Sequence, residues 1–309
     1  MLVKRALRLM GNQFELAICA DVESVALGQL DVAIAEIRRI EQLLSTFQEH
    51  SITNQINNSA GLAPVAVPDE VFQLIARCQR ISALTQGAFD ISYGGIDTRF
   101  WNFDLSMTQL PSREVALESV KNINYQHIIL DKQNGTVFLS QPGMRIGFGG
   151  VGKGYAAEQA KQLLRKLGIK SGYVNAAGDL SAWGNQENGD PWTVGIANPN
   201  QSQYAFSSLQ ITNTSVATSG NYEKFVLIDG KRYSHTIDPK TGFPVSGIKS
   251  VTIITPNAEL ADALASPIMV MGVHAGLDLI NQLKGVACLL IDDHDHIFTS
   301  KNIHLNQQK

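Results

Sequence analysis

The chain has 309 residues, of which 44% are hydrophobic and 17% are charged, and its formal net charge at pH 7 is -3. This composition is typical of a globular protein with a substantial core, and the length suits one large domain or two ordinary ones. The slight negative charge argues against a nucleic-acid partner, and no run approaches the roughly 18 apolar residues that a membrane span needs.

The N-terminal segment allows two interpretations. Its basic start and the run "LAIC", which ends at Cys19, resemble a lipoprotein cleavage site. Polar residues between positions 12 and 15 interrupt the apolar region that an export signal requires. Apolar side chains instead alternate with polar or small ones over residues 14–18, which favours a first strand. The sequence therefore predicts no signal peptide, a cytoplasmic protein as written, and leaves open a periplasmic or membrane-associated protein whose leader has been removed.

Helices and polar connections alternate through the rest of the first half. The spacing of apolar residues predicts helices over residues 24–47 and 69–85 and a short helix near 113–120. Between the first two helices, residues 48–61 show no core-forming periodicity. The glycine-rich and aromatic residues 87–104 are expected to form an ordered loop. Strands are predicted over residues 127–131, 136–140 and 144–148.

The second half is mostly strand. Helical spacing is found over residues 153–167 and again over 258–284. Strands are predicted over residues 171–176, 180–184, 192–197, 207–212, 223–229, 233–238 and 250–255, with a closing hairpin over 286–293 and 296–300. Runs of strands without β–α–β alternation indicate an α+β fold of mixed sheets flanked by helices, not a Rossmann fold. Three scattered cysteines are expected to be small buried side chains: Cys19, Cys78 and Cys288.

The segment "GFGGVGKG", residues 147–154, resembles two phosphate-binding motifs. A dinucleotide fingerprint needs an acid at the end of the next strand, but that strand ends at Asn175. A P-loop needs Ser or Thr after its lysine, but Gly154 follows Lys153. Glycines before a helix nevertheless let backbone amides approach a phosphate, which the helix N-terminus and Lys153 also favour. A bare strand-to-helix turn explains two glycines better than four, so this segment is predicted to bind phosphate.

Two oxygen-bearing side chains, Asp262 and Ser266, lie four residues apart on the helix predicted over residues 258–284. At this spacing both face the same way, and a carboxylate with a hydroxyl suits a hard cation such as Mg2+ when phosphates supply further ligands. Such pairs are also common on solvated helix faces. Pro267 follows directly and removes one backbone donor, so the helix is expected either to widen locally or to end there.

Polar residues gather around a predicted turn, "DPKTG", at residues 238–242. His235 precedes this turn. A lone histidine is most often structural, but the density of polar side chains on adjacent strand ends favours a site. These side chains are those of Thr218, Ser219, Asn221, Tyr222, Asp238 and Thr241.

Six blocks in these regions resemble, in the same order, the ApbE family of flavin transferases. They include "LMGNQFEL", "STFQEHSITNQIN", "GAFDISYGG", "GFGGVGKGYAAEQA", "SVATSGNYEKF…YSHTIDPKTGFPV" and "SVTIITPNAELADALAS". The resemblance covers residues 8–290 and implies a single domain there, followed by a C-terminal strand and polar tail over residues 291–309. Family members move FMN from FAD to a protein threonine, so the resemblance implies an enzyme, an FAD:protein FMN transferase.

The resemblance also implies the chemistry of the site. FAD would bind extended with Mg2+ at its diphosphate, and a threonine hydroxyl of an acceptor flavoprotein would attack the FMN-side phosphorus and release AMP. The implied Mg2+ ligands are Asp262, Ser266 and the backbone carbonyl of Gly150. Flavin contacts are implied for Met10, Phe47, Ala88, Phe89, Asp90, Gly147, Gly149, Gly150 and Lys153. Asp262 and His235 are the candidate catalytic residues, with His235 either contacting the diphosphate or assisting removal of the threonine proton.

Three positions depart from the family pattern. The family commonly has Asp at position 147, Thr at 266 and no proline at 267, where this chain has Gly147, Ser266 and Pro267. Ser266 preserves the hydroxyl. Gly147 in place of Asp removes one FAD contact implied by the resemblance, and Pro267 changes the helix beside the metal. FAD hydrolysis to FMN and AMP, or non-catalytic flavin binding, therefore stay as alternatives. The identity of the acceptor and the presence of a homodimer are left open.

Overall fold

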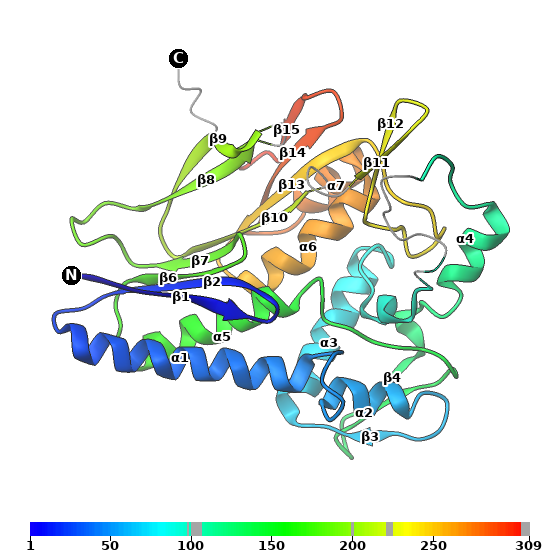
Figure 1. Ribbon diagram of the computed structural model, residues 1–309, viewed down its shortest axis with the longest axis horizontal. Helices are drawn as coiled ribbons and strands as arrows, with labels where there is room; N and C mark the ends of the chain where they lie inside the picture. The colour runs from blue at the N-terminus through cyan, green and yellow to red at the C-terminus, as the bar shows by residue number, and fades with distance from the viewer. Residues whose placement is uncertain (98, 100–106, 199–200, 221–224, 304–309) are drawn as a thin grey trace.

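The computed structural model describes residues 1–97, 99, 107–198, 201–220 and 225–303 (Figure 1). Within these residues, eight strands form one sheet that is antiparallel at every pairing. In spatial order they are β1 (Leu2–Leu9), β2 (Asn12–Cys19), β6 (Gly172–Ala176), β7 (Asp179–Trp183), β10 (Thr214–Gly220), β13 (Ile248–Thr255), β14 (Ala287–Asp292) and β15 (Ile297–Thr299). Because the described strands of this sheet contain no parallel pair, the α+β prediction is confirmed and a Rossmann fold is excluded.

One face of this sheet is covered by helices. They are α1 (Glu23–Leu44), α5 (Gly152–Lys166) and α6 (Ala258–Met271). In α1 the buried residues recur every three or four positions, from Leu30 through Ile34 and Ile37 to Leu44. This spacing turns one apolar stripe of the helix toward the sheet, where it is removed from water.

The other face of the sheet carries a long hairpin of β8 (Trp192–Asn198) and β9 (Gln201–Ile211). Trp192 packs there against Ala182 of β7 and Val216 of β10. Side chains alternate between the two faces along each strand, so these residues form a second apolar layer, separate from the core beneath the helices. The sheet is therefore buried on both faces at its centre.

A smaller lobe lies between α1 and α5 in the chain and occupies the right-hand side of Figure 1, from its middle to its lower edge. Its elements are α2 (Ile52–Asn58), β3 (Val65–Ala66), α3 (Asp69–Leu84), η1 (Ile91–Gly95), α4 (Arg113–Val120), η2 (Tyr125–His127), β4 (Ile128–Asp131) and β5 (Thr136–Leu139). A further hairpin of β11 (Phe225–Ile228) and β12 (Lys231–Ser234) packs on this lobe, because Val226 shares an apolar cluster with Val120.

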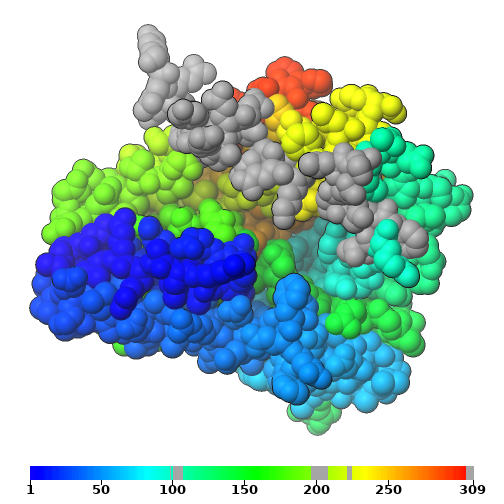
Figure 2. All heavy atoms as spheres, viewed as in Figure 1, coloured from blue at the N-terminus to red at the C-terminus, as the bar shows by residue number. Residues whose placement is uncertain are grey.

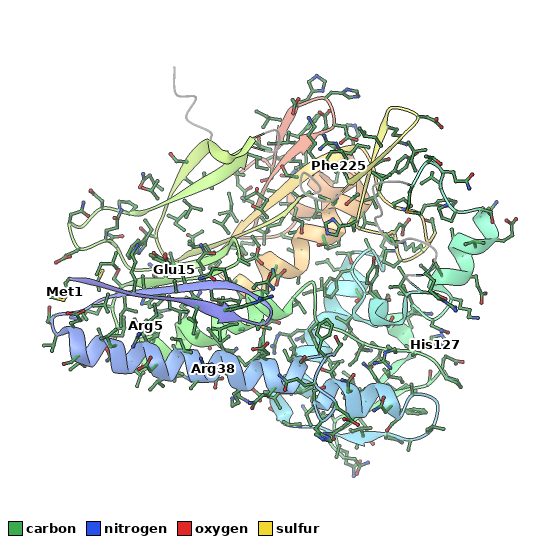
Figure 3. All side chains as sticks on the ribbon, viewed as in Figure 1. Met1, Arg5, Glu15, Arg38, His127 and Phe225 are labelled. Atoms are coloured by element: carbon green, nitrogen blue, oxygen red, sulfur yellow. The ribbon has the colours of Figure 1, made fainter. Side chains whose placement is uncertain are left out.

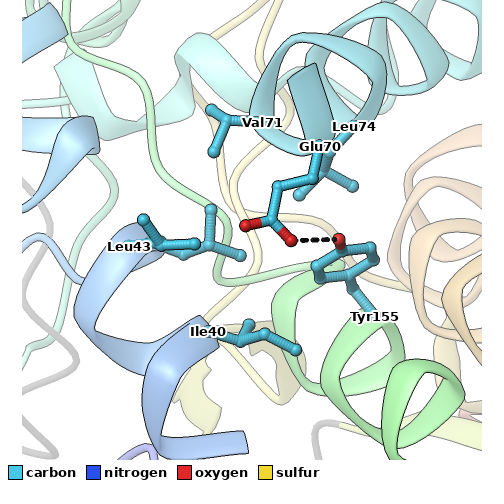
Figure 4. Close-up of a pocket in the computed structure, with 7 residues that line it drawn as sticks. Ile40, Leu43, Glu70, Val71, Leu74 and Tyr155 are labelled. Atoms are coloured by element: carbon cyan, nitrogen blue, oxygen red, sulfur yellow. Dashed lines mark hydrogen bonds between the residues drawn. The ribbon is translucent and has the colours of Figure 1, made fainter. Parts of the chain in front are cut away.

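The lobe is joined to the helix layer where α1, α3 and α5 meet. Apolar side chains of α1 and α3 line a small space there, beside Glu70 and Tyr155 (Figure 4). The Tyr155 hydroxyl donates a hydrogen bond to Glu70 at 3.4 Å, and Arg39 forms an ion pair with the same carboxylate. Burial raises the pKa of Tyr155 to about 12, so the hydroxyl keeps the proton that it donates.

The segment that ends at Cys19 is strand β2, as its alternation predicted. β1 pairs with β2 along its whole length, and Met10 and Gly11 form the turn with φ values of 49° and 74°. Two residues with positive φ match the twist of a tight hairpin. Figure 3 shows Arg5 and Glu15 on this hairpin, whose outer surface is dark blue in Figure 2.

Two local predictions in the first half were wrong. Residues 144–148, predicted as a strand, form no regular element. The backbone N–H and C=O of Ile146 are instead bonded to the side chain of Asn57. The polar residues 48–61, in which no element was expected, contain helix α2, whose cap is the side chain of Ser51.

The helix predicted over residues 258–284 is divided into α6 and α7 (Val273–Ile280). Gly272 separates them with a φ of 82°, which an L side chain rarely adopts. Pro267 lies inside α6 and does not end it. Because proline has no N–H, the carbonyl of Ala263 loses its helical donor at that turn.

The three cysteines are free, with Cys78 and Cys288 buried and Cys19 partly exposed. Burial raises the pKa of the Cys78 and Cys288 thiols, so neither is a reactive thiolate at neutral pH. Among the helices in the described residues, none combines the length and apolar character that crossing a bilayer demands.

Candidate active site

A cavity of about 680 Å³ opens where the β1–β2 turn, the end of α1, the η1 segment and the start of α5 meet. The segment after β12 and the second half of α6 complete its walls. Its volume is typical of a ligand site, for which roughly 300–1,000 Å³ is usual. Of the residues predicted from the sequence, the cavity is lined by Met10, Phe47, Ala88, Phe89, Asp90, Gly147, Gly149, Gly150, Lys153, His235 and Ser266. Asp262 is not on the lining and lies beside Lys153.

The glycines before and within α5 serve two different purposes. Gly147, Gly149 and Gly150 line the cavity, where a backbone without side chains can approach a ligand closely. Gly154 faces α6 instead, and a Cβ there would lie 2.3 Å from the carbonyl oxygen of Ala258. A simple turn would not need so many glycines. This segment has them because some leave room for a ligand and one allows α5 to pack closely on α6.

Buried polar contacts fix the start of α6 against α5. The side chain of Asn257 caps α6 by accepting a hydrogen bond from Leu260 N at 2.9 Å. Glu158 of α5 accepts a hydrogen bond from Ala258 N, also at 2.9 Å. These contacts lie one turn before Asp262 and set the position of that carboxylate.

Asp262 is a buried carboxylate held against the N-terminus of α5. Its Oδ2 accepts a hydrogen bond from Gly154 N at 2.8 Å, and its side chain is 9% exposed. The N-cap residue Val151 has no polar side chain, so Asp262 caps α5 from a neighbouring helix, where the helix dipole favours negative charge. Burial raises the pKa of Asp262 to about 6, and the nearby ammonium group of Lys153 opposes this shift.

Lys153 lies between two carboxylates. Its Nζ forms an ion pair with Asp179 and lies 3.9 Å from Oδ1 of Asp262. Burial acts to lower the pKa of Lys153, but the two carboxylates outweigh it, so the pKa is raised and the amine stays charged. One positive and two negative groups leave this buried cluster with a net negative charge.

The residues predicted to hold Mg2+ have suitable chemistry. Ser266 lines the cavity one turn beyond Asp262, and its Oγ lies 2.9 Å from Oγ of Ser219 at the end of β10. A carboxylate, a hydroxyl and the carbonyl of Gly150 are hard oxygen ligands, which Mg2+ prefers, and the net negative charge favours a cation. The described residues hold no group of three or more His, Cys, Asp or Glu suited to a metal, so further ligands would come from substrate or water.

Two wall residues differ in what they offer a ligand. Phe47 is 98% exposed at the cavity and presents a large aromatic face on which a planar ring can stack. Asp90 is buried, and its oxygens accept hydrogen bonds from Ser92 and from Tyr125 N. Burial raises the pKa of Asp90, and these hydrogen bonds oppose the shift. The Asp90 carboxylate therefore holds the η1 wall in place.

The polar residues predicted around His235 occupy different settings. His235 lines the cavity directly after β12. Asp238 and Thr241 bond to one another at 3.0 Å within their turn, and Thr218 bonds across to the neighbouring strand. Two of the predicted residues lie outside the described part of the chain: Asn221 and Tyr222. His235 and Ser219 are thus the members of this group that the structure brings to the cavity or its edge.

Two buried asparagines of α2, which sequence reasoning missed, organise the cavity walls. Asn54 donates to the carbonyls on both sides of Phe47, at 3.0 and 2.9 Å. Asn57 donates to the carbonyl of Ile146 at 3.0 Å and accepts from its N–H at 2.7 Å, directly before Gly147. Hydrophobic periodicity cannot reveal such residues, because they are buried through hydrogen bonds.

Replacing Asn57 by alanine is expected to lower the free energy of unfolding by about 1–3 kcal/mol, because the buried amide of Ile146 loses its partner. Ligand affinity should fall as well, since the glycine turn loses its anchor. Urea unfolding and a titration with FAD measure the two effects. The exposed neighbour Asn58, replaced by alanine, is the matched control. Equal effects of both substitutions would contradict the anchoring role.

Comparison with known proteins shows the family to which this chain belongs. A family model described as the ApbE family matches residues 10–290. The chain belongs to the ApbE family. Its cavity, its glycine turn and the segment that carries Asp262 all lie within the matched residues.

Relatives and solved structures agree with ApbE membership. The chain is 30% identical over 296 residues to the FAD:protein FMN transferase of Klebsiella pneumoniae (strain 342), covering 95% of this chain and 88% of that one. It is 32% identical over 257 residues to the FAD:protein FMN transferase of Escherichia coli (strain K12), with 81% and 73% covered. The crystal structure of the ApbE protein from Thermotoga maritima matches with a TM-score of 0.86 and 28% identity over 97% of both chains. The resemblance predicted from the sequence blocks is thereby confirmed.

Proposed function

We propose that this ApbE family member is an FAD:protein FMN transferase that requires Mg2+ and transfers FMN to a threonine hydroxyl of an acceptor protein. The observation that carries the proposal is that one cavity collects the glycine turn, Lys153, His235 and Ser266 from distant parts of the chain. The names of the relatives from Klebsiella and Escherichia coli support the same activity.

In the proposed reaction, the threonine oxygen bonds to the FMN-side phosphorus of FAD as the bond to the bridging oxygen breaks. AMP leaves, and the threonine proton passes to a base. His235, which lines the cavity, is the base that we propose. Phosphoryl transfer of this kind depends on aligning the two oxygens and on neutralising charge. The cavity walls would provide this alignment.

The remaining residues divide between the diphosphate and the flavin ring of FAD. The glycine turn presents backbone N–H groups, and Lys153 a cation, to the diphosphate. Asp262, Ser266 and the carbonyl of Gly150 would hold Mg2+, which neutralises diphosphate charge when bound. The exposed ring of Phe47 and the wall residues Met10, Ala88, Phe89 and Asp90 border the space for the flavin.

The test combines the protein with FAD, Mg2+ and a flavodoxin-like or membrane-redox acceptor that carries a target threonine. We expect flavin fluorescence that stays on the denatured acceptor, together with an equal amount of AMP. Both should be lost with EDTA, and both should be lost with an acceptor whose threonine is replaced by valine. No labelling and no AMP with several acceptors would overturn the proposal.

The same assay distinguishes two other activities. AMP release without any acceptor, at a rate that an acceptor does not raise, would identify an FAD pyrophosphatase. Tight FAD binding without turnover and without dependence on Mg2+ would identify a flavin-binding protein.

A further inference from the structure

Asp179 begins β7 directly after a tight turn. Ala177 and Gly178 both have positive φ, of 57° and 100°, and the side chain of Asn175 accepts a hydrogen bond from Gly178 N at 2.8 Å. An alanine in this left-handed region costs about 1–2 kcal/mol, so the surrounding contacts must hold it there. The turn places the Asp179 carboxylate beside Lys153, and the Asp179 side chain is 8% exposed.

The contacts of Lys153 are unequal. It forms a direct ion pair with Asp179, whereas Oδ1 of Asp262 is 3.9 Å away. One lysine charge cannot neutralise two carboxylates, so pairing with Asp179 leaves the charge of Asp262 without full compensation. Burying a carboxylate whose charge is incompletely compensated costs free energy, so binding of a second cation beside Asp262 is favoured.

We propose that Asp179 is a positioning residue that sets the affinity of the site for a divalent cation by holding Lys153 on the β7 side of the cluster. The inference rests on the proposed function, because it takes Asp262 as a Mg2+ ligand. When Asp179 is removed, the ammonium group of Lys153 is released, pairs with Asp262 and competes there with the metal. Asp179 acts through Lys153 and is not itself a ligand.

The experiment measures cation binding without any turnover. Mn2+, a paramagnetic hard cation that accepts the same oxygen ligands as Mg2+, is titrated into the full-length flavin-free protein, and free Mn2+ is followed by electron paramagnetic resonance. Competition with Mg2+ checks that both ions share the site. The proteins are the unsubstituted chain, Asp179→Asn, Lys153→Met and the double variant.

Asp179→Asn is expected to weaken Mn2+ binding by about tenfold or more. The released ammonium group of Lys153 would pair with Asp262, and at intermediate dielectric the energy of such a close charge pair corresponds to more than a factor of ten in affinity. In the Lys153→Met protein the same substitution is expected to have a much smaller effect, since no lysine can be released onto Asp262. The exposed Asp278 of α7, changed to asparagine, is the matched control for loss of one negative charge and should leave binding unchanged.

Equal weakening by Asp179→Asn with and without Lys153 would overturn the inference, because Asp179 would then act only as a distant charge. If Asp179→Asn does not fold, Asp179→Glu retains the charge and displaces it by one methylene, and it should weaken binding only while Lys153 is present. An unsubstituted protein that binds no Mn2+, either alone or together with FAD in the absence of acceptor, would overturn the metal site of the proposed function, and this inference with it. The experiment therefore distinguishes failure of this inference alone from failure of the proposed function.

Discussion

Replacing Asp262 by asparagine is expected to lower the rate of FMN transfer by about 10³-fold, the scale on which loss of one preorganised charge contact acts. Asparagine keeps the shape of the side chain, and its amide oxygen can still accept the hydrogen bond from Gly154 N. The contact between α5 and α6 therefore survives. What the variant lacks is the negative charge that, in the proposed function, the buried carboxylate offers to a cation at the diphosphate.

The rate is measured as AMP release and as flavin on the acceptor, at saturating FAD over a series of Mg2+ concentrations. Asp278, exposed on α7, is replaced by asparagine as the control for the change in net charge, and its transfer rate should be unchanged. Thermal unfolding of both variants checks that the fold is intact. Transfer by the Asp262 variant at the unsubstituted rate would contradict the proposed role of the metal.

Elements with a clear apolar period were predictable from the sequence. In α1 the buried residues follow the helical repeat from Leu30 to Leu44, so pattern and packing agree. β1 was missed because it is an edge strand whose polar residues, such as Lys4 and Arg5, hide its alternation. Residues 144–148 have the composition of a strand, but the Asn57 side chain takes the hydrogen bonds that a neighbouring strand would need.

The candidate site was predictable where its residues are close in sequence or share a motif with the family. Asp262 and Ser266 were found because one helical turn relates them. The pairing of Asp179 with Lys153 and that of Ser219 with Ser266 were missed, although Ser219 itself was predicted near the site, because the partners are 26 and 47 residues apart. A single sequence carries no periodic signal for such pairs, which arise only when the sheet places β7 and β10 beside the helices.

Replacing His235 by glutamine is expected to lower the transfer rate by about 10²-fold at saturating FAD, with little change in FAD affinity. His235 lines the cavity directly after β12, next to Thr236 and Ile237, where in the proposed reaction it would border the diphosphate and the incoming threonine. Glutamine retains hydrogen-bonding groups but cannot take up a proton at neutral pH. The substitution therefore separates proton transfer from binding.

Single-turnover reactions at increasing FAD concentration give the transfer rate and the FAD affinity separately. His274, exposed on α7, is replaced by glutamine as the matched control and should leave both quantities unchanged. A loss of rate that saturating FAD restores would assign His235 to diphosphate binding, because a missing base slows the bound complex whatever the FAD concentration. A loss that persists at saturation would assign His235 to the proton-transfer step of the proposed reaction.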